Sequence, residues 1–174
     1  GIQAEACFRR ALRAAEESGN PSALARVSLS LVESYARDDA KAIEFAQKAH
    51  DLREWLDPAR QVDVDADLAK SLWISGKPEA ALATMPRTLS EAHALGYRDA
   101  EASLLCIKSM IEFQIGRLDA VARSSAEAEA IADPDDPDPM LVRKALQLQA
   151  DAAMAAGDNV RALELCAMAL PRME

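Results

Sequence analysis

Aromatic side chains are scarce in this sequence. Phe, Trp and Tyr together make up 4% of its 174 residues, although half of all residues are hydrophobic. Alanine supplies much of that hydrophobic share, and β-branched residues are sparse. Because alanine, leucine and the long charged residues favour helices, whereas β-branched and aromatic residues favour strands, the composition predicts an all-α protein.

Positive charge and long apolar runs are also lacking. Lys and Arg number 20 against 29 Asp and Glu, which gives a net charge of −9. Such a surface repels phosphate backbones and anionic membranes, so we expect neither nucleic acid nor membrane contact by this segment. No apolar run approaches the roughly 20 residues that span a bilayer, and no signal peptide is visible. These features favour a cytoplasmic location; a periplasmic one stays open if the parent protein is a membrane-bound sensor.

Cysteine occurs three times, as Cys7, Cys106 and Cys166. These residues are far apart and form no C-x-x-C pair, the spacing on which many metal and redox sites depend. Each lies on the apolar stripe of a predicted helix. We therefore predict three small buried side chains, and the odd count favours a reducing compartment.

Catalytic motifs are absent from the sequence. It contains no HExxH, no nucleophile elbow and no glycine loop that would hold phosphates. His50 and His93 have no cysteine near them in sequence, and the carboxylates are spread over helix positions expected to face solvent. We predict that the segment is not an enzyme and holds no metal and no cofactor.

Two stretches of the sequence are rich in aspartate. Asp63, Asp65 and Asp67 alternate like the start of a calcium loop, but Leu68 and Ile74 occupy the positions where an EF-hand needs Gly and Glu. We interpret these three as an exposed helical face. The run 133–139 carries four aspartates among prolines, and we interpret it as a solvated connector whose Asp138 caps the next helix.

The sequence does contain a repeat. Alanine-rich helix starts recur at 39–43, 76–82, 116–122 and 157–163. Gly76 and Gly116 are 40 residues apart, and Gly116 and Gly157 are 41 apart. A period of this length is typical of a solenoid, in which one supersecondary unit stacks on copies of itself.

Apolar residues recur at helical spacing between the turn signals. Pro86 lies inside one predicted helix, where we expect a kink or break. The alternating stretch 62–68 could be read as a strand, but a lone strand has no pairing partner, so we keep it helical. The pattern predicts nine helices, at 2–18, 22–36, 40–56, 59–75, 78–95, 98–115, 118–132, 139–156 and 160–170.

These features resemble the tetratricopeptide repeat. Residues 31–35 (LVESY) are similar to the family's Leu-small-x-x-Tyr step, and residues 68–72, Gly76 and residues 81–82 look like the next copy. The later first helices match loosely. The period is about 40 rather than the family's commonest 34, and the first hairpin turn is about two residues short and lacks its Gly. Repeats of this length are similar to those of bacterial signalling proteins.

The resemblance implies a right-handed α-α superhelix of about four and a half helical hairpins. We expect residues 1–174 to form a single repeat domain, cut from a longer protein within the repeat pattern. In this family the first helices of the hairpins line a groove that takes up a protein or peptide. Carried over to this sequence, the groove positions are Arg26, Glu33, Asp63, Lys70, Trp73, Glu112, Lys144, Gln147 and Asp151.

Trp73 has two interpretations, as the anchor of a bound partner or as a ring packed between repeats. The function that the resemblance implies is a non-catalytic binding module, the sensory or regulatory region of a signalling protein such as a diguanylate cyclase or histidine kinase. One alternative is the helical array of an ATP-dependent transcriptional activator. Another is an assembly scaffold, in which copies form a homo-oligomer through uncapped repeat ends.

Overall fold

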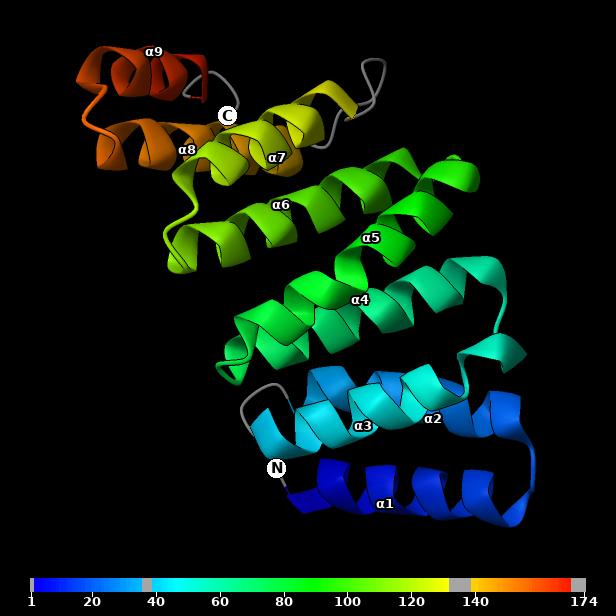
Figure 1. Ribbon diagram of the computed structural model, residues 1–174. Helices are drawn as coiled ribbons and strands as arrows, with labels where there is room; N and C mark the ends of the chain where they lie inside the picture. The colour runs from blue at the N-terminus through cyan, green and yellow to red at the C-terminus, as the bar shows by residue number, and fades with distance from the viewer. Residues whose placement is uncertain (1, 36–38, 132–138, 170–174) are drawn as a thin grey trace. The chain divides into compact units, whose positions relative to one another are not determined.

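The computed structural model describes residues 2–35, 39–131 and 139–169. Within these ranges the chain is helical and contains no strand, which confirms the predicted all-α class (Figure 1). None of the described helices is long and apolar enough to cross a membrane. The elements are α1 (Ile2–Glu17), α2 (Pro21–Ser34), α3 (Asp39–Asp51), the 3-10 helix η1 (Arg53–Trp55), α4 (Pro58–Ile74), α5 (Pro78–Ala94), α6 (Arg98–Gln114), α7 (Leu118–Ile131), α8 (Pro139–Ala155) and α9 (Asn159–Ala169).

The chain divides into two compact units, Gly1–Thr84 and Met85–Glu174. The border lies inside α5, directly before Pro86. We describe each unit by itself. The predicted single repeat domain thus consists of two compact parts, and whether they act as one domain stays a prediction.

Unit 1 packs α1, α2, α3 and α4 in chain order, with α2 in contact with both α3 and α4 (Figure 1). One core cluster joins Leu31 of α2, Phe45 of α3 and Leu68 of α4. Tyr35 stacks on the Phe45 ring with centroids 5.5 Å apart, and the Lys41 ammonium lies 4.7 Å from the Tyr35 centroid. Phe8 packs against the same cluster, so three of the seven aromatic residues of the sequence gather here.

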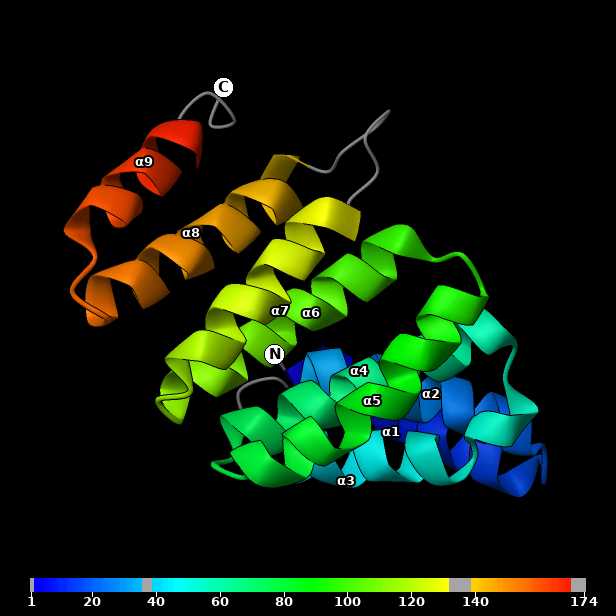
Figure 2. The same ribbon diagram turned by 45° about the horizontal axis from the view of Figure 1, so that its top comes forward.

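Unit 2 layers α6, α7, α8 and α9 side by side, as the two views agree (Figures 1 and 2). Its main core relies on small side chains, because Ala102, Ala128, Ala145 and Ala152 are all buried between α6, α7 and α8. Small side chains let helix axes approach closely. This explains how an alanine-rich sequence with few aromatic residues can still form a core.

Glycine ends the first helix of two hairpins by the same geometry. Gly76 and Gly116 have φ angles of +75° and +76°, in the left-handed region that favours glycine. In each turn the next residue bonds back to the helix: Lys77 N–H donates to Leu72 O, and Arg117 N–H donates to Glu112 O, both at 2.9 Å. This is the Schellman arrangement of a helix C-terminus. The glycines identified from sequence therefore stand at the expected turns.

One predicted helix is shorter than expected. The sequence pattern predicts a helix over 40–56, but α3 ends at Asp51 and a separate 3-10 turn follows at Arg53–Trp55. Leu56 then adopts an extended conformation, and Asp57 caps α4 by accepting a hydrogen bond from the Arg60 N–H at 3.1 Å. Pro58 at the first turn of α4 disfavours a helical residue before it, so the chain must leave the helix.

Two other local expectations have different outcomes. The alternating stretch 62–68 is helical as predicted, inside α4. At Pro86 the expectation was a kink or a break: the helix does not break, because α5 runs from Pro78 to Ala94 with the proline inside it, and the kink stays a prediction. The shortened first hairpin turn at 36–38, the acidic connector at 133–138 and the proposed Asp138 cap lie outside the described residues.

Candidate functional site

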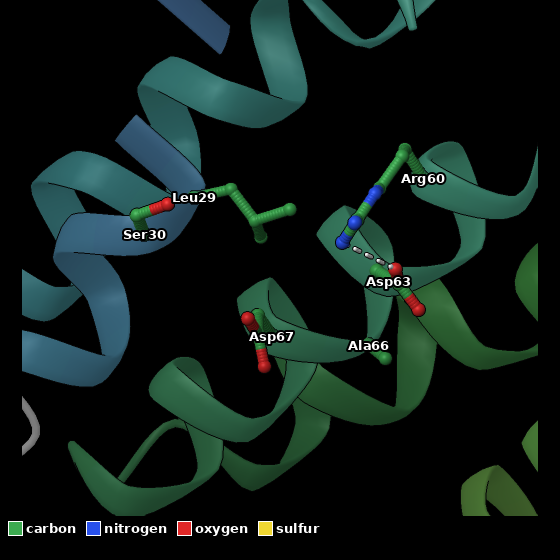
Figure 3. Close-up of a pocket in the computed structure, with 6 residues that line it drawn as sticks. All are labelled: Leu29, Ser30, Arg60, Asp63, Ala66 and Asp67. Atoms are coloured by element: carbon green, nitrogen blue, oxygen red, sulfur yellow. Dashed lines mark hydrogen bonds and ion pairs between the residues drawn. The ribbon is translucent and has the colours of Figure 1, made fainter. Parts of the chain in front are cut away.

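A pocket of about 350 Å³ opens between two first helices of unit 1 (Figure 3). Helix α2 and helix α4 are in contact, and each contributes one wall. This size lies at the lower end of the roughly 300–1,000 Å³ range of ligand pockets, so it suits one or two side chains better than a large ligand. Its lining residues are Leu29, Ser30, Arg60, Asp63, Ala66 and Asp67.

The helical period brings the α4 residues of this pocket together. Arg60, Asp63 and Asp67 are three and four residues apart, so they lie on one face of the helix. The Asp57 cap and Pro58 fix where α4 begins and thereby set the direction of that face. The sequence identified Asp63 as a groove residue, and it does line this pocket.

The pocket contains an ion pair of its own. Arg60 Nη1 lies 3.4 Å from Asp63 Oδ2, and both side chains are about half exposed. Figure 3 shows the Arg60 guanidinium beside Asp63 and the Asp67 carboxylate on another side of the same opening, with Leu29 facing it. The lining therefore combines an apolar wall with two carboxylates and one guanidinium.

Three further predicted groove residues of unit 1 lie near the pocket along the same helices. Arg26 precedes Ser30 by one turn on α2, and Lys70 follows Asp67 by nearly one turn on α4; both are exposed. Trp73 is half-buried near the end of α4, which leaves both of its interpretations open. The side chain of Glu33 lies outside the described residues.

The predicted groove residues of unit 2 behave differently. On α8, Gln147 is exposed and both Lys144 and Asp151 are half-buried. Since they are three and four residues apart, they share one helical face. Glu112 of α6 is 5% exposed and departs from the expectation. Ser124 Oγ of α7 donates to its carboxylate at 2.8 Å and Lys108 Nζ lies 2.9 Å from it, so the side chain is held inside the α6–α7 hairpin.

A second hollow of about 430 Å³ surrounds the turn between α6 and α7 in unit 2. All of its lining residues come from the single stretch 116–123, including Arg117 and Arg123. Within the part of the chain that the structure describes, no second helix contributes a wall. The pocket between α2 and α4 is therefore the better candidate, since two separate elements build it.

Sequence reasoning missed a buried ion cluster in unit 1. Asp65 of α4 is 2% exposed, and its two carboxylate oxygens lie 2.7 Å from His50 Nδ1 and 3.1 Å from Arg53 Nη2. The cluster joins the end of α3, the η1 turn and α4. The prediction that residues 63, 65 and 67 form one exposed face is wrong for Asp65, because residues two apart on a helix point about 200° apart.

That helical period was the signal that could have identified Asp65 as inward-facing.

Both histidines lie next to carboxylates. In unit 2, His93 Nδ1 is 3.1 Å from Glu101 Oε1, although the His93 side chain is well exposed. Among the described residues, no three His, Cys, Asp or Glu side chains gather as a metal site would require. We interpret the His50 cluster as a structural brace between α3 and α4.

The cysteine prediction is correct for one residue of three. Cys106 is buried in the core of unit 2, where desolvation raises the pKa of its thiol to about 11. Cys7 and Cys166 are exposed, so the prediction that they are buried is wrong. Cys7 lies on α1 and Cys166 on α9, the first and last described helices. Only one side of each of these helices is packed against a described neighbour.

Comparison with solved structures identifies similar folds. BtubC (BKLC) from P. vanneervenii matches with a TM-score of 0.86 and 21% identity over 98% of this chain and 72% of its own. The apo form of RapI has a TM-score of 0.86 and 14% identity, over 98% of this chain and 63% of its own. MamA has a TM-score of 0.69 and 18% identity, over 95% and 84%.

These neighbours are helical repeat proteins; RapI has tetratricopeptide repeats and MamA is similar to them. The chain therefore has the tetratricopeptide-like helical-repeat fold that its sequence indicated. It spans less than two thirds of the RapI chain. No protein-family model matches the sequence, and no curated protein matches it significantly.

Proposed function

We propose that this chain is a non-catalytic module that takes up a protein or peptide segment on the face of unit 1 formed by α2 and α4. The observation that carries the proposal is the pocket between these helices, which has an apolar wall and several charged groups. Ligand sites commonly combine an apolar surface with a few polar groups that fix orientation. The helical-repeat fold supports the same role, because such arrays use the first helices of successive hairpins as a binding surface.

The proposal also covers the kind of longer protein that contains this segment. The repeat length favours the sensory or regulatory region of a bacterial signalling protein, such as a diguanylate cyclase or histidine kinase. Binding would then bias an attached output domain. The helical array of an ATP-dependent transcriptional activator is the alternative parent, and its ligand could be small.

Filling the pocket tests the proposal. Ala66 lies on the pocket wall, so Ala66→Phe should block entry while leaving the helix intact. Ala122→Phe on α7 is the matched control, since Ala122 is exposed and belongs to unit 2. A protein captured by the wild type would be identified by mass spectrometry, purified and titrated against both variants. Loss of binding in Ala66→Phe alone supports the proposal, whereas equal binding by both variants refutes it.

A specific observation on α9 favours a second candidate, the assembly of copies of this chain. Ala46 of α3 and Ser125 of α7 occupy the same repeat position and are fully buried, Ala46 in a cluster with Leu68 of the next hairpin. The corresponding residue of α9, Cys166, is exposed. Among the described residues, none covers this position of α9, and an exposed stacking surface promotes association.

Sedimentation over a range of concentrations separates the two candidates. If the wild type self-associates, Cys166→Glu should shift it toward the monomer, and Ala122→Glu, at an exposed position of α7, should not. A wild type that remains monomeric at all concentrations would exclude assembly through α9. Binding of a partner in the pocket, tested by Ala66→Phe, would then be the remaining candidate function.

A further inference from the structure

The hydrogen-bond pattern of helix α5 is disturbed twice within one turn. Pro86 has no backbone N–H, so the Leu82 carbonyl cannot receive the hydrogen bond that an α-helix would give it. The adjacent Ala81 carbonyl accepts a hydrogen bond from Thr84 Oγ1 at 2.8 Å. A hydroxyl that bonds back to a helix carbonyl competes with the backbone N–H and often bends the helix. Both features therefore weaken the same turn of α5.

The border between the two compact units falls in this weakened turn. It separates Thr84 from Met85, so residues 78–84 of α5 belong to unit 1 and residues 85–94 belong to unit 2. Sharp bends in helices occur mainly at proline. The turn that is easiest to bend is thus the turn at which the two units are joined.

Each half of α5 is attached within its own unit. The first half follows directly on the turn at the end of α4, where Lys77 N–H donates to Leu72 O at 2.9 Å. The second half packs through Leu89 against the core of unit 2, and its His93 Nδ1 lies 3.1 Å from Glu101 Oε1 of α6. Bending at the border between the halves would leave all of these contacts intact.

Water can reach the carbonyl that Pro86 deprives of its usual donor. The C=O of Leu82 points along the helix toward residue 86, and Ala83, Pro86 and Arg87 around it are exposed. A bend that opens this side of α5 hydrates the carbonyl, so no buried polar group is left unsatisfied. The exposed side of the turn can therefore open at little cost.

We propose that α5 is a hinge, which bends at Thr84–Pro86 and lets unit 1 turn relative to unit 2. Residues 78–84 then move with unit 1 and residues 85–94 with unit 2. The inference goes beyond the proposed function, because the hinge needs no bound partner and contains no residue of the pocket between α2 and α4.

Two matched proline variants test the hinge. Pro86→Ala restores the N–H donor for the Leu82 carbonyl and should stiffen α5. Because Pro86 is exposed, the smaller side chain leaves no cavity. Pro78→Ala makes the same chemical change at the first turn of the same helix, where a missing N–H costs little, and is the control.

The two exposed cysteines provide one labelling site in each unit. Cys7 lies in unit 1 and Cys166 in unit 2, and Cys106 is buried and should stay unlabelled. Double electron–electron resonance between spin labels on the exposed pair records a distance distribution. Dilution with unlabelled protein restricts it to distances within one chain.

Pro86→Ala should narrow this distribution relative to the wild type, and Pro78→Ala should leave it unchanged. An unchanged width in Pro86→Ala, or equal narrowing in both variants, would overturn the inference.

Amide hydrogen exchange locates the bend. In Pro86→Ala the amides of Arg87 and Thr88, directly after the border, should exchange at least about ten-fold more slowly, because proline strongly disfavours a helix interior. The amides of α7 should exchange as in the wild type. Equal slowing in α7 would mean that the substitution stabilises unit 2 as a whole, which contradicts a local hinge.

Discussion

Asp65 and Glu112 are both buried carboxylates on the first helix of a hairpin, yet the two units hold them differently. Asp65 pairs with His50 and Arg53, which come from the end of the preceding hairpin, so this cluster links successive hairpins. Glu112 pairs with Lys108 of its own helix and Ser124 of its own hairpin. The first cluster braces the stacking of repeats, and the second braces a single repeat.

The cations also differ in their access to water. The Arg53 side chain is 10% exposed, whereas the Lys108 side chain is 29% exposed and can turn toward solvent. A buried charge that loses its partner is far more costly than one that can be rehydrated. We therefore expect the two carboxylates to contribute unequally to stability, and the following experiments can strengthen or remove that distinction.

The largest effect is expected for Asp65→Ala. It leaves the Arg53 guanidinium buried without its carboxylate, and breaking such a pair costs about 3–5 kcal/mol. Urea unfolding should report a loss of that order. The control is Asp63→Ala, since its pair with Arg60 is half exposed and should cost less than about 1 kcal/mol. Equal losses in the two variants would show that the buried cluster has no special role.

A double variant checks the cause of that loss. Asp65→Ala combined with Arg53→Met removes both charges and places an apolar chain in the buried site, which is often close to neutral for stability. Recovery of most of the lost free energy would identify the loss of the Asp65 carboxylate from beside the buried Arg53 guanidinium as the cause. No recovery would point to the hydrogen bond with His50 instead.

Glu112→Ala should have a smaller effect. It removes hydrogen bonds to a charged group, each worth about 1.5–3 kcal/mol, but Lys108 can then reach water. Urea unfolding should therefore report a loss below that of Asp65→Ala. Glu112→Gln keeps an acceptor for the Ser124 hydroxyl and should lose less still. A loss in Glu112→Ala equal to that in Asp65→Ala would remove the distinction between the units.

Matched glycine variants in the turns of the two units should lose equal amounts of stability. Gly76→Ala and Gly116→Ala each place a Cβ at a positive φ, which costs about 1–2 kcal/mol. Apart from the adjacent residues of the chain, no atom of the described residues lies within 4 Å of the added carbon at either position, so backbone strain should set the cost. Thermal unfolding should give equal losses, and a clear inequality would reveal a turn that carries additional strain.

The smallest effect concerns ionisation of the buried Cys106 thiol, which does not change the free energy of unfolding at neutral pH. Burial raises the pKa of Cys106 to about 11 from an ordinary 9.0. Below pH 9 the thiol is protonated in both the folded and unfolded states. Between pH 9 and 11 only the unfolded state releases the proton, so stability falls across this window. The fall measured by urea unfolding should be weaker in Cys106→Ala.

Thiol labelling provides an independent readout. In the native wild type at pH 8, Cys7 and Cys166 should react with a thiol reagent, and Cys106 should react only after denaturant is added. Rapid labelling of Cys106 without denaturant would show that the core of unit 2 opens readily.

Sequence reasoning succeeded wherever local rules decide the structure. Gly76 and Gly116 were identified at turns because a left-handed residue favours glycine. The assignment of Asp63 to a binding groove stays a prediction, although this residue lines the pocket. Sequence reasoning failed at Asp65 and Glu112, which were expected to face solvent. Charged residues are seldom buried without partners, and their partners, His50 and Ser124, become neighbours only when helices pack.

The pocket likewise depends partly on local helical spacing and partly on the packing of separate helices. Helical spacing alone puts Arg60, Asp63 and Asp67 on one face of α4. Only the packing of α2 against α4 brings Leu29 to that face and closes a pocket of about 350 Å³. The sequence by itself determined the all-α class, the repeat length and the turns, because these depend on residues a few positions apart. Tertiary structure decided which charges are buried and where a ligand can enter, because both depend on contacts between distant residues.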